Sequence, residues 1–284
     1  MIAESKAAAR ARPPAVTKPP RSDPINLAAQ RILQAITSGT PGLPVRDLIG
    51  DTDIAAAYAV QQVVNGARVE RGAYLVGRKI GLTSAAVQRQ IGVEQPDFGV
   101  LFNDMRWEDG GVIPASKLLQ PRAEAEIAFV LAQDLDDGPF TVEHVAGAVA
   151  FAVAALEIVD SRVAGWDVRI TDTVADNASS GMFVLGIRHV RLESFVPLEV
   201  AMTMTKNGVV VSNGDGKACL GDPLAALAWL ADTACTLGEP LQAGEIVLSG
   251  ALGAMVPVAP GDTVRADITN LGAVTAIFST EGTK

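Results

Sequence analysis

Three glutamates are the residues best suited to chemistry in this sequence. Glu124 and Glu126 lie in the segment 121–131, whose alternating apolar and polar residues predict a β-strand with both carboxylates and Arg122 on one face. Glu157 follows in the apolar run 154–159, which predicts a second strand. Clustered carboxylates repel and are costly to bury, so a cation is expected between them. Three carboxylates without clustered histidine or cysteine favour a hard ion such as Mg²⁺ or Mn²⁺.

A structural explanation of the same glutamates is also open. Glu124 and Glu126 could lie on a solvated sheet face, and Glu157 could pair with Arg162 or Arg122. The continuous apolar run around Glu157 favours the metal hypothesis, because an unpaired charge in such a strand would be hard to explain.

Two further polar residues lie where a ligand could approach. Lys79 sits among apolar residues and glycines in the strand-like segment 74–83, and glycine within a strand often marks a close approach of a ligand. A lysine that protects a sheet edge is an equally ordinary explanation. Asp97 belongs to the turn-like stretch 95–99, and by itself could be a residue that stabilises a turn.

The stretch 172–181 is small and polar, and we expect a loop with little helix before a strand at 182–185. Its hydroxyl groups, including Ser179 and Ser180, could bind a ligand or simply hydrogen-bond within the loop. Arg162 follows Glu157 closely, and could hold the end of that strand or contact a carboxylate.

The elements around these residues divide the chain into three parts. Residues 1–22 are basic and proline-rich and predict a disordered tail. Capping residues and apolar spacing predict helices at 23–39 and from Thr52 or Asp53 to 72, which together form a helical subdomain at 23–73. Short β-like runs dominate 74–284, with an Asn207-Gly208 hairpin and one clear helix from Asp222 to Gly238.

Composition narrows the classes of function. The 284 residues carry a net charge of −9, and the pI of 4.8 argues against nucleic acid or an anionic membrane as partner. The longest apolar run, 145–156, is too short to cross a bilayer. Cys219 and Cys235 have no metal-ligand spacing and fit a reducing cytoplasm. We expect a cytoplasmic protein that acts on a small molecule.

Several motifs in order resemble one enzyme family. They are Gly77-Arg78-Lys79-Ile80-Gly81-Leu82-Thr83, Gln95-Pro96-Asp97-Phe98-Gly99, Pro121-Arg122-Ala123-Glu124-Ala125-Glu126, Ala154-Ala155-Leu156-Glu157-Ile158-Val159-Asp160-Ser161-Arg162, Ala175-Asp176-Asn177-Ala178-Ser179-Ser180 and Leu248-Ser249-Gly250-Ala251-Leu252-Gly253. The set resembles the 2-hydroxypenta-2,4-dienoate (2-keto-4-pentenoate) hydratases of the fumarylacetoacetate hydrolase superfamily. The resemblance runs from about residue 23 to the C-terminus.

This resemblance implies an α+β fold, with a mixed β-roll core of the fumarylacetoacetate hydrolase C-terminal type and a small N-terminal helical subdomain. It implies Mg²⁺ or Mn²⁺ held by Glu124, Glu126 and Glu157. Lys79 and Asp97 match the family's site lysine and aspartate. Family members are homo-oligomers of the bacterial cytoplasm that act in aromatic or steroid breakdown, and they can associate with other enzymes of the same pathway, such as a decarboxylase or an aldolase.

The implied reaction explains these residue types. A 2-oxo acid can chelate the ion through its carboxylate and C2 oxygen, after which a proton reaches the far carbon and water adds at C4. Lys79, near a cation, should lose its proton readily and could bind the substrate carboxylate or move a proton. Asp97 could orient the water, and Ser179 or Ser180, with Arg162, could place the substrate.

Three other interpretations compete with hydration. The related 4-oxalocrotonate decarboxylases share the fold and metal, but tend to have proline where this sequence has Ala125. A carbon–carbon hydrolase would need a catalytic histidine, and His144 and His189 lie away from the matched motifs. A non-catalytic partner subunit would have little need for three clustered glutamates and Lys79.

Overall fold

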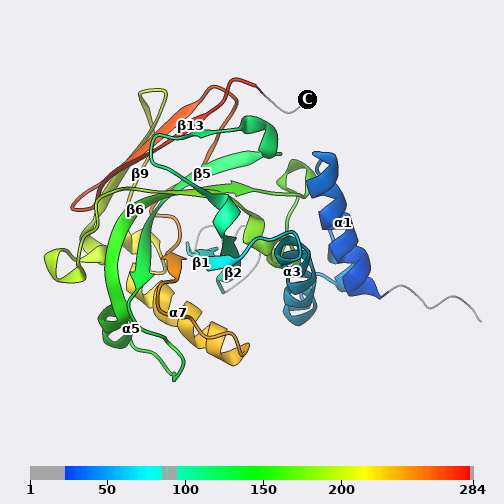
Figure 1. Ribbon diagram of the computed structural model, residues 1–284, viewed down its shortest axis with the longest axis horizontal. Coiled ribbons are helices and arrows are strands. Elements are labelled where there is room, and N and C mark those ends of the chain that lie inside the picture. The colour runs from blue at the N-terminus through cyan, green and yellow to red at the C-terminus, as the bar shows by residue number, and fades with distance from the viewer. Residues whose placement is uncertain (1–22, 85–87, 89–94, 282–284) are drawn as a thin grey trace, which may run out of the picture.

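The computed structural model describes residues 23–84, 88 and 95–281 (Figure 1). The tail expected at residues 1–22 lies outside this part of the chain. Two mixed β-sheets and several helices make an α+β fold, as the sequence predicts. None of the helices among the described residues has both the length and the apolar character needed to cross a membrane.

Three helices open the described chain: α1 (Pro24–Ser38), α2 (Arg46–Ile49) and α3 (Ile54–Val69). The Asp23 carboxylate accepts a hydrogen bond from Ile25 N at 3.1 Å and so caps α1, while Asp53 caps α3 in the same way. Both predicted helices are therefore confirmed. Their apolar faces pack on one another and on α6 (Ile170–Ala175), beside the long curved strands in Figure 1.

The larger sheet follows the order β2-β1-β10-β5-β6-β7-β3, with β11 paired to β5. Its strands are β1 (Leu75–Gly81), β2 (Asp97–Phe102), β3 (Arg106–Trp107), β5 (Pro121–Leu131), β6 (Val149–Asp160), β7 (Ser180–Leu185), β10 (Ile246–Leu248) and β11 (Val256–Pro257). The first strand follows closely after α3, so we propose that the helical subdomain and the β-roll meet between residues 73 and 74.

Strand β5 has the two faces that its alternation predicts. Ala123, Ala125, Ile127, Phe129 and Leu131 are almost fully buried in the main core. Burying a side chain as large as Phe129 contributes roughly 1.5–3 kcal/mol to folding. The opposite face therefore carries the glutamates at one end of the strand.

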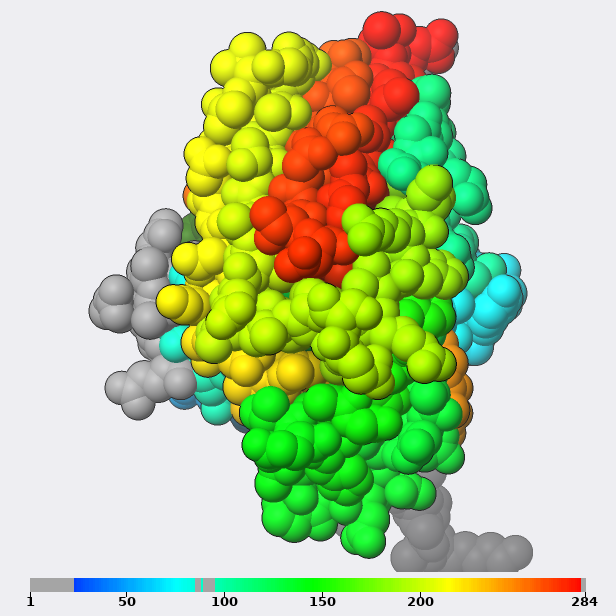
Figure 2. Space-filling view, turned by 90° about the vertical axis from the view of Figure 1, so that its left-hand side faces the viewer, coloured from blue at the N-terminus to red at the C-terminus, as the bar shows by residue number. Residues whose placement is uncertain are grey.

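The smaller sheet has the order β4-β13-β12-β8-β9. Its strands are β4 (Val112–Ile113), β8 (Ala201–Lys206), β9 (Val209–Asp215), β12 (Thr263–Ile268) and β13 (Gly272–Phe278). Figure 2 shows the yellow β9 region, the orange and red strands and the teal segment before β5 following one another across one face. The Asn207-Gly208 turn joins β8 to β9 with both residues at positive φ, so the predicted hairpin is confirmed.

The remaining helices are α5 (Val142–Ala148) and α7 (Pro223–Thr236), which pack against each other below the strands in Figure 1. The helix predicted from Asp222 is confirmed. The helix-poor loop predicted at 172–181 is wrong in its first part, because 172–175 belong to α6. Asp172 accepts a hydrogen bond from Arg169 N at 3.0 Å, which stabilises the first turn of that helix.

Candidate metal centre

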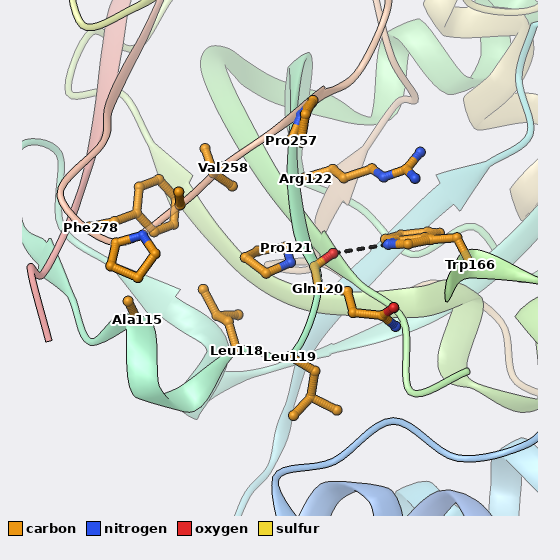
Figure 3. Close-up of a pocket in the computed structure, with 12 residues that line it drawn as sticks. Ala115, Leu118, Leu119, Gln120, Pro121, Arg122, Trp166, Pro257, Val258 and Phe278 are labelled. Atoms are coloured by element: carbon orange, nitrogen blue, oxygen red, sulfur yellow. Dashed lines mark hydrogen bonds between the residues drawn. The ribbon is translucent and has the colours of Figure 1, made fainter. Parts of the chain in front are cut away.

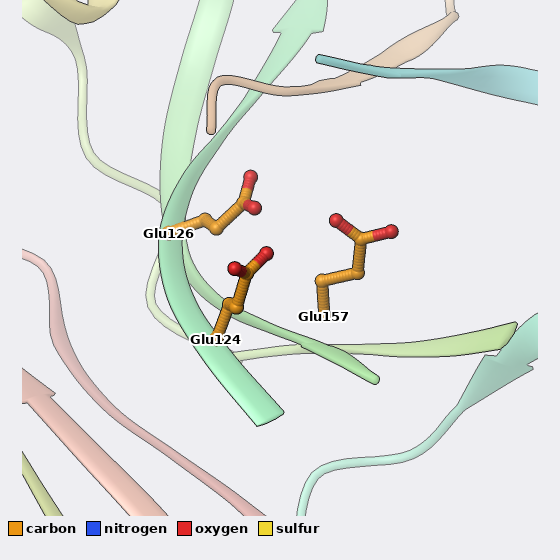
Figure 4. Close-up of side chains that lie close together, drawn as sticks. All are labelled: Glu124, Glu126 and Glu157. Carbon is orange, nitrogen blue, oxygen red and sulfur yellow. The ribbon is translucent and has the colours of Figure 1, made fainter. Parts of the chain in front are cut away.

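The three predicted glutamates meet at one end of the larger sheet. Glu124 and Glu157 are direct cross-strand partners on β5 and β6, and Glu126 follows on the same face of β5. Figure 4 shows their side chains turned toward one space. One oxygen of each carboxylate lies within 4.8 Å of the others. The sheet register therefore builds a three-carboxylate cluster from distant segments.

These oxygens fit a divalent ion. Gly250 N donates a hydrogen bond to Glu126 Oε2 at 2.7 Å, and Lys79 Nζ lies 3.2 Å from Glu157 Oε1. Glu126 Oε1 and Glu157 Oε2 are buried without a hydrogen-bond partner among the described residues. Buried oxygens normally have a partner, and a hard cation would supply one here. The donor set of the cluster therefore suits a divalent metal ion.

Burial and mutual repulsion raise the pKa values of the three glutamates. Burial, and then the charge of Glu157, raise the pKa of Glu124 to about 7. Burial and the other two carboxylates raise the pKa of Glu126 well above its ordinary value. Burial also raises the pKa of Glu157, against the opposing charge of Lys79. The site is thus electrostatically unfavourable until positive charge enters it.

Lys79 and Asp97 are brought beside the cluster by the pairing of β1 with β2. Both side chains are buried, and Asp97 Oδ2 accepts a hydrogen bond from Thr173 Oγ1 at 3.1 Å. Burial lowers the pKa of Lys79, but nearby carboxylates, Glu157 and Asp97 first, outweigh it and raise the pKa overall. The expectation that Lys79 loses its proton readily assumed a bound cation; the carboxylates alone favour its ammonium form.

A cavity of about 700 Å³ opens over these residues. Its polar lining includes Lys79, Asp97, Glu124, Thr173 and Ser179. Apolar side chains from the segments 159–168 and 251–255 complete the wall. A cavity of this size and mixed lining suits a small organic acid.

The structure does not bring two of the predicted substrate-binding residues to this cavity. The Arg162 guanidinium binds Asp176, and its Nη1 donates to Ser180 O at 2.8 Å. Ser180 Oγ donates to Asn177 O at 2.8 Å, whereas Ser179 does line the cavity. Arg162 and Ser180 thus brace the loop that presents Ser179. No binding or catalytic role of the predicted residues is tested by this geometry, and these roles stay predictions.

Sequence reasoning missed three residues that line the cavity: Arg122, Trp166 and Thr173. The alternation of β5 placed Arg122 on the glutamate face, and that signal could have assigned it to the site. Nothing local in the sequence marks Trp166. A second, mainly apolar cavity of about 360 Å³ has Arg122 and Trp166 in its lining as well (Figure 3). These two residues line both cavities.

Comparison with known proteins defines the class. A family model described as fumarylacetoacetate (FAA) hydrolase C-terminal matches residues 80–278, so the chain belongs to this family. The predicted β-roll type is thereby confirmed.

Its close relatives define the group within that class. The chain is 53% identical over 259 residues to the TodF product hydratase of Pseudomonas putida, covering 91% of this chain and 97% of that protein. It is 51% identical over 251 residues to a 2-keto-4-pentenoate hydratase of Burkholderia vietnamiensis, covering 88% and 96%. The predicted hydratase group and enzyme class are confirmed.

A solved structure shares most of the fold. The 4-oxalocrotonate decarboxylase of Pseudomonas putida G7, complexed with magnesium and adipate, superposes with a TM-score of 0.86 at 36% identity. The match covers 89% of this chain and 97% of that one. The magnesium in that protein agrees with the divalent-metal character of the three-glutamate cluster.

Proposed function

We propose that this protein is a hydro-lyase that adds water to 2-hydroxypenta-2,4-dienoate, or a close homologue, to give 4-hydroxy-2-oxopentanoate. The names of its relatives support the substrate class. The observation that carries the proposal is the clustering of three glutamates with Lys79 beside one small-molecule cavity, which Lys79 and Glu124 line.

We propose that Glu124, Glu126 and Glu157 hold Mg²⁺ or Mn²⁺. A bound divalent ion supplies Lewis acidity toward the carboxylate and C2 oxygens of a 2-oxo acid. The partnerless oxygens of Glu126 and Glu157 support this assignment. Because all three glutamates are anchored on paired strands and Glu126 and Glu157 are also buried, the cluster is preorganised for a small ion.

The reaction requires proton transfers that the protein's own residues can make. The C2 hydroxyl loses a proton while C5 gains one, and then the oxygen of water bonds to C4 while a proton adds at C3. Lys79 lies beside the cluster, with Nζ 3.2 Å from Glu157 Oε1, and would move a proton to or from the substrate. Thr173 orients the carboxyl of Asp97, which would position the water, and Ser179 would hold the substrate.

Broader proposals rest on the same family resemblance. They are a homo-oligomer in the bacterial cytoplasm, a place in the meta-cleavage breakdown of aromatic compounds or steroids, and association with a pathway decarboxylase or aldolase. Size-exclusion chromatography with light scattering would measure the subunit number directly.

One assay separates hydration from decarboxylation, which the likeness to 4-oxalocrotonate decarboxylase keeps as the second candidate. Purified protein with Mn²⁺ receives 2-hydroxypenta-2,4-dienoate, and loss of the dienol absorbance and the mass of the product are followed. We expect a product heavier by one water. Parallel incubation with 4-oxalocrotonate tests for carbon dioxide, and its release without any hydration would overturn the proposal.

The roles of Lys79 and Asp97 are tested with the same assay. Lys79→Ala and Asp97→Ala should each lower kcat by about 100-fold or more, the usual contribution of a positioned acid or base. Bound Mn²⁺, measured by atomic absorption, should stay stoichiometric because the three glutamates are retained. Unchanged turnover in either variant would remove that residue from the mechanism.

A further inference from the structure

We propose that Arg122 binds the carboxylate of the 2-oxo acid substrate. The carboxylate needs a cationic partner besides the metal site, and Arg122 is a cation in the cavity wall that has no ion-pair partner within 4 Å among the described residues. This inference deepens the proposed hydratase function and rests on it.

Arg122 belongs to the same strand face as the glutamates. It is two residues before Glu124 on β5, so the alternation of the strand points both side chains to one side. It pairs across the sheet with Val159, two residues after Glu157. Arg122 and Val159 both line the 700 Å³ cavity, next to the metal cluster.

The guanidinium is held in place but its charge is not neutralised. It stacks on the Trp166 ring, with 4.4 Å between Cζ and the ring centroid (Figure 3). Its Nη1 lies 3.9 Å from Met255 Sδ, a weak acceptor. Within the described part of the chain it forms no ion pair and no side-chain hydrogen bond to oxygen, although its charge lowers the pKa of Glu124. Its planar donors therefore remain available for a carboxylate.

The stacking partner is itself fixed. Trp166 Nε1 donates a hydrogen bond to Gln120 O at 3.0 Å, and Gly165 N donates to Gln120 Oε1 at 2.8 Å. Figure 3 shows the indole lying flat beneath the arginine, with its bond to Gln120 dashed. A guanidinium held on a fixed ring loses less conformational entropy when it binds an anion.

Charge balance gives the reason why such a cation is needed. Glu124, Glu126, Glu157 and Asp97 surround the site, and Lys79 already pairs with Glu157. When all four carboxylates are ionised, they carry one more negative charge than the positive charges of a bound divalent ion and Lys79 together. An incoming carboxylate therefore meets net negative charge, and Arg122 is the other cation of the cavity wall among the described residues.

The test uses the full-length, Mn²⁺-loaded protein and a non-reacting probe. Binding of 2-oxopentanoate is compared with that of 2,3-hexanedione, which replaces the carboxylate by an uncharged acetyl group. Arg122→Met should weaken 2-oxopentanoate binding by about 10- to 100-fold, the loss expected for a hydrogen-bonded charge pair, and leave dione binding unchanged. Arg122→Lys should recover part of the loss, because it restores charge without the planar fork.

Controls separate binding from packing. Arg265→Met makes the same substitution at an exposed arginine paired with Asp267, and should bind both probes like the wild type. If Arg122→Met binds 2-oxopentanoate with wild-type affinity, or loses both probes equally, the proposal is overturned while hydration by the wild type stands. A wild-type protein that neither hydrates the dienoate nor binds 2-oxopentanoate would overturn both proposals.

Discussion

At the scale of single residues, the glutamate cluster cannot be fully ionised at neutral pH without a cation. Glu124 titrates near pH 7 because burial and the charge of Glu157 oppose its ionisation. A metal ligand must lose its proton before it coordinates, so metal binding and protonation compete at this carboxylate. Repulsion between the partly or fully buried carboxylates destabilises the empty site, and the same repulsion favours binding of a cation.

We therefore predict that Mn²⁺ affinity rises with pH through the range around pH 7 in which Glu124 loses its proton. Below that range, affinity should fall by about tenfold per pH unit for each proton displaced. Because the pKa of Glu124 is higher in the folded than in the unfolded protein, this group favours folding of the metal-free protein at low pH. Its contribution to the free energy of unfolding is complete below 4.5, the ordinary pKa of a glutamate, and is lost as the pH rises to about 7. The gain in Tm on adding Mn²⁺ should accordingly be larger at pH 8 than at pH 6.

Calorimetry in buffers of different ionisation enthalpy would measure the protons released. Glu124→Gln removes one titrating ligand and should reduce the pH dependence as well as weaken binding. Equal Mn²⁺ affinity at pH 6 and pH 8 in the wild type would contradict the prediction.

At the scale of elements, the approach of β1 to β2 places Asp97 beside Lys79. Gly81 pairs with Asp97 across these strands. A Cβ atom at Gly81 would lie 2.3 Å from Asp97 Oδ1 and 3.4 Å from Lys79 Nζ. Because Gly81 has no side chain, the carboxylate of Asp97 can occupy the space beside it.

We predict that Gly81→Ala displaces Asp97 and lowers kcat by about 100-fold, the order expected when a catalytic group moves by about 1 Å. Mn²⁺ binding should be retained, because β5 and β6 carry the ligands. Gly66→Ala is the matched control, since a Cβ there meets no atom within 4 Å. If both variants lost activity, or neither did, the space beside Gly81 would not be what positions Asp97 for catalysis.

The sequence was most informative where a local pattern decides the structure. Alternation in 121–131 predicted β5 and its glutamate face, and capping residues predicted α1 and α7. Local pattern could not show that Asp176 engages Arg162, or that Trp166 covers Arg122, because these contacts depend on how distant segments pack. Such packing decides which polar residues line the cavity and which form hydrogen bonds and ion pairs within its walls.

At the scale of the whole molecule, the N-terminal helices support one wall of the site. Gln61 on α3 donates hydrogen bonds to Phe98 O at 3.1 Å and to Val174 O at 2.9 Å, which links β2 to α6. Asp172 on α6 accepts from Val45 N at 2.8 Å and from Arg46 Nη1 at 2.6 Å. Helix α6 carries Thr173, so these contacts extend from the helical segment to Asp97.

The buried link through Asp172 predicts a coupled loss of stability and activity. Asp172→Asn removes the negative partner of Arg46 from a side chain with no exposed surface, and should lower the free energy of unfolding by about 3 kcal/mol. Because α6 would be held less firmly against α2, Thr173 should orient Asp97 less well and kcat should fall. The proposed metal ligands lie on β5 and β6, so Mn²⁺ stoichiometry should not change. Urea unfolding, turnover and bound Mn²⁺ measure the three quantities.

Asp267→Asn is the control. This aspartate is 51% exposed and paired with Arg265, so the substitution should change the free energy of unfolding by less than about 0.5 kcal/mol. If Asp172→Asn matched that control in both stability and kcat, the helical segment would be a separate attachment rather than a support of the active site.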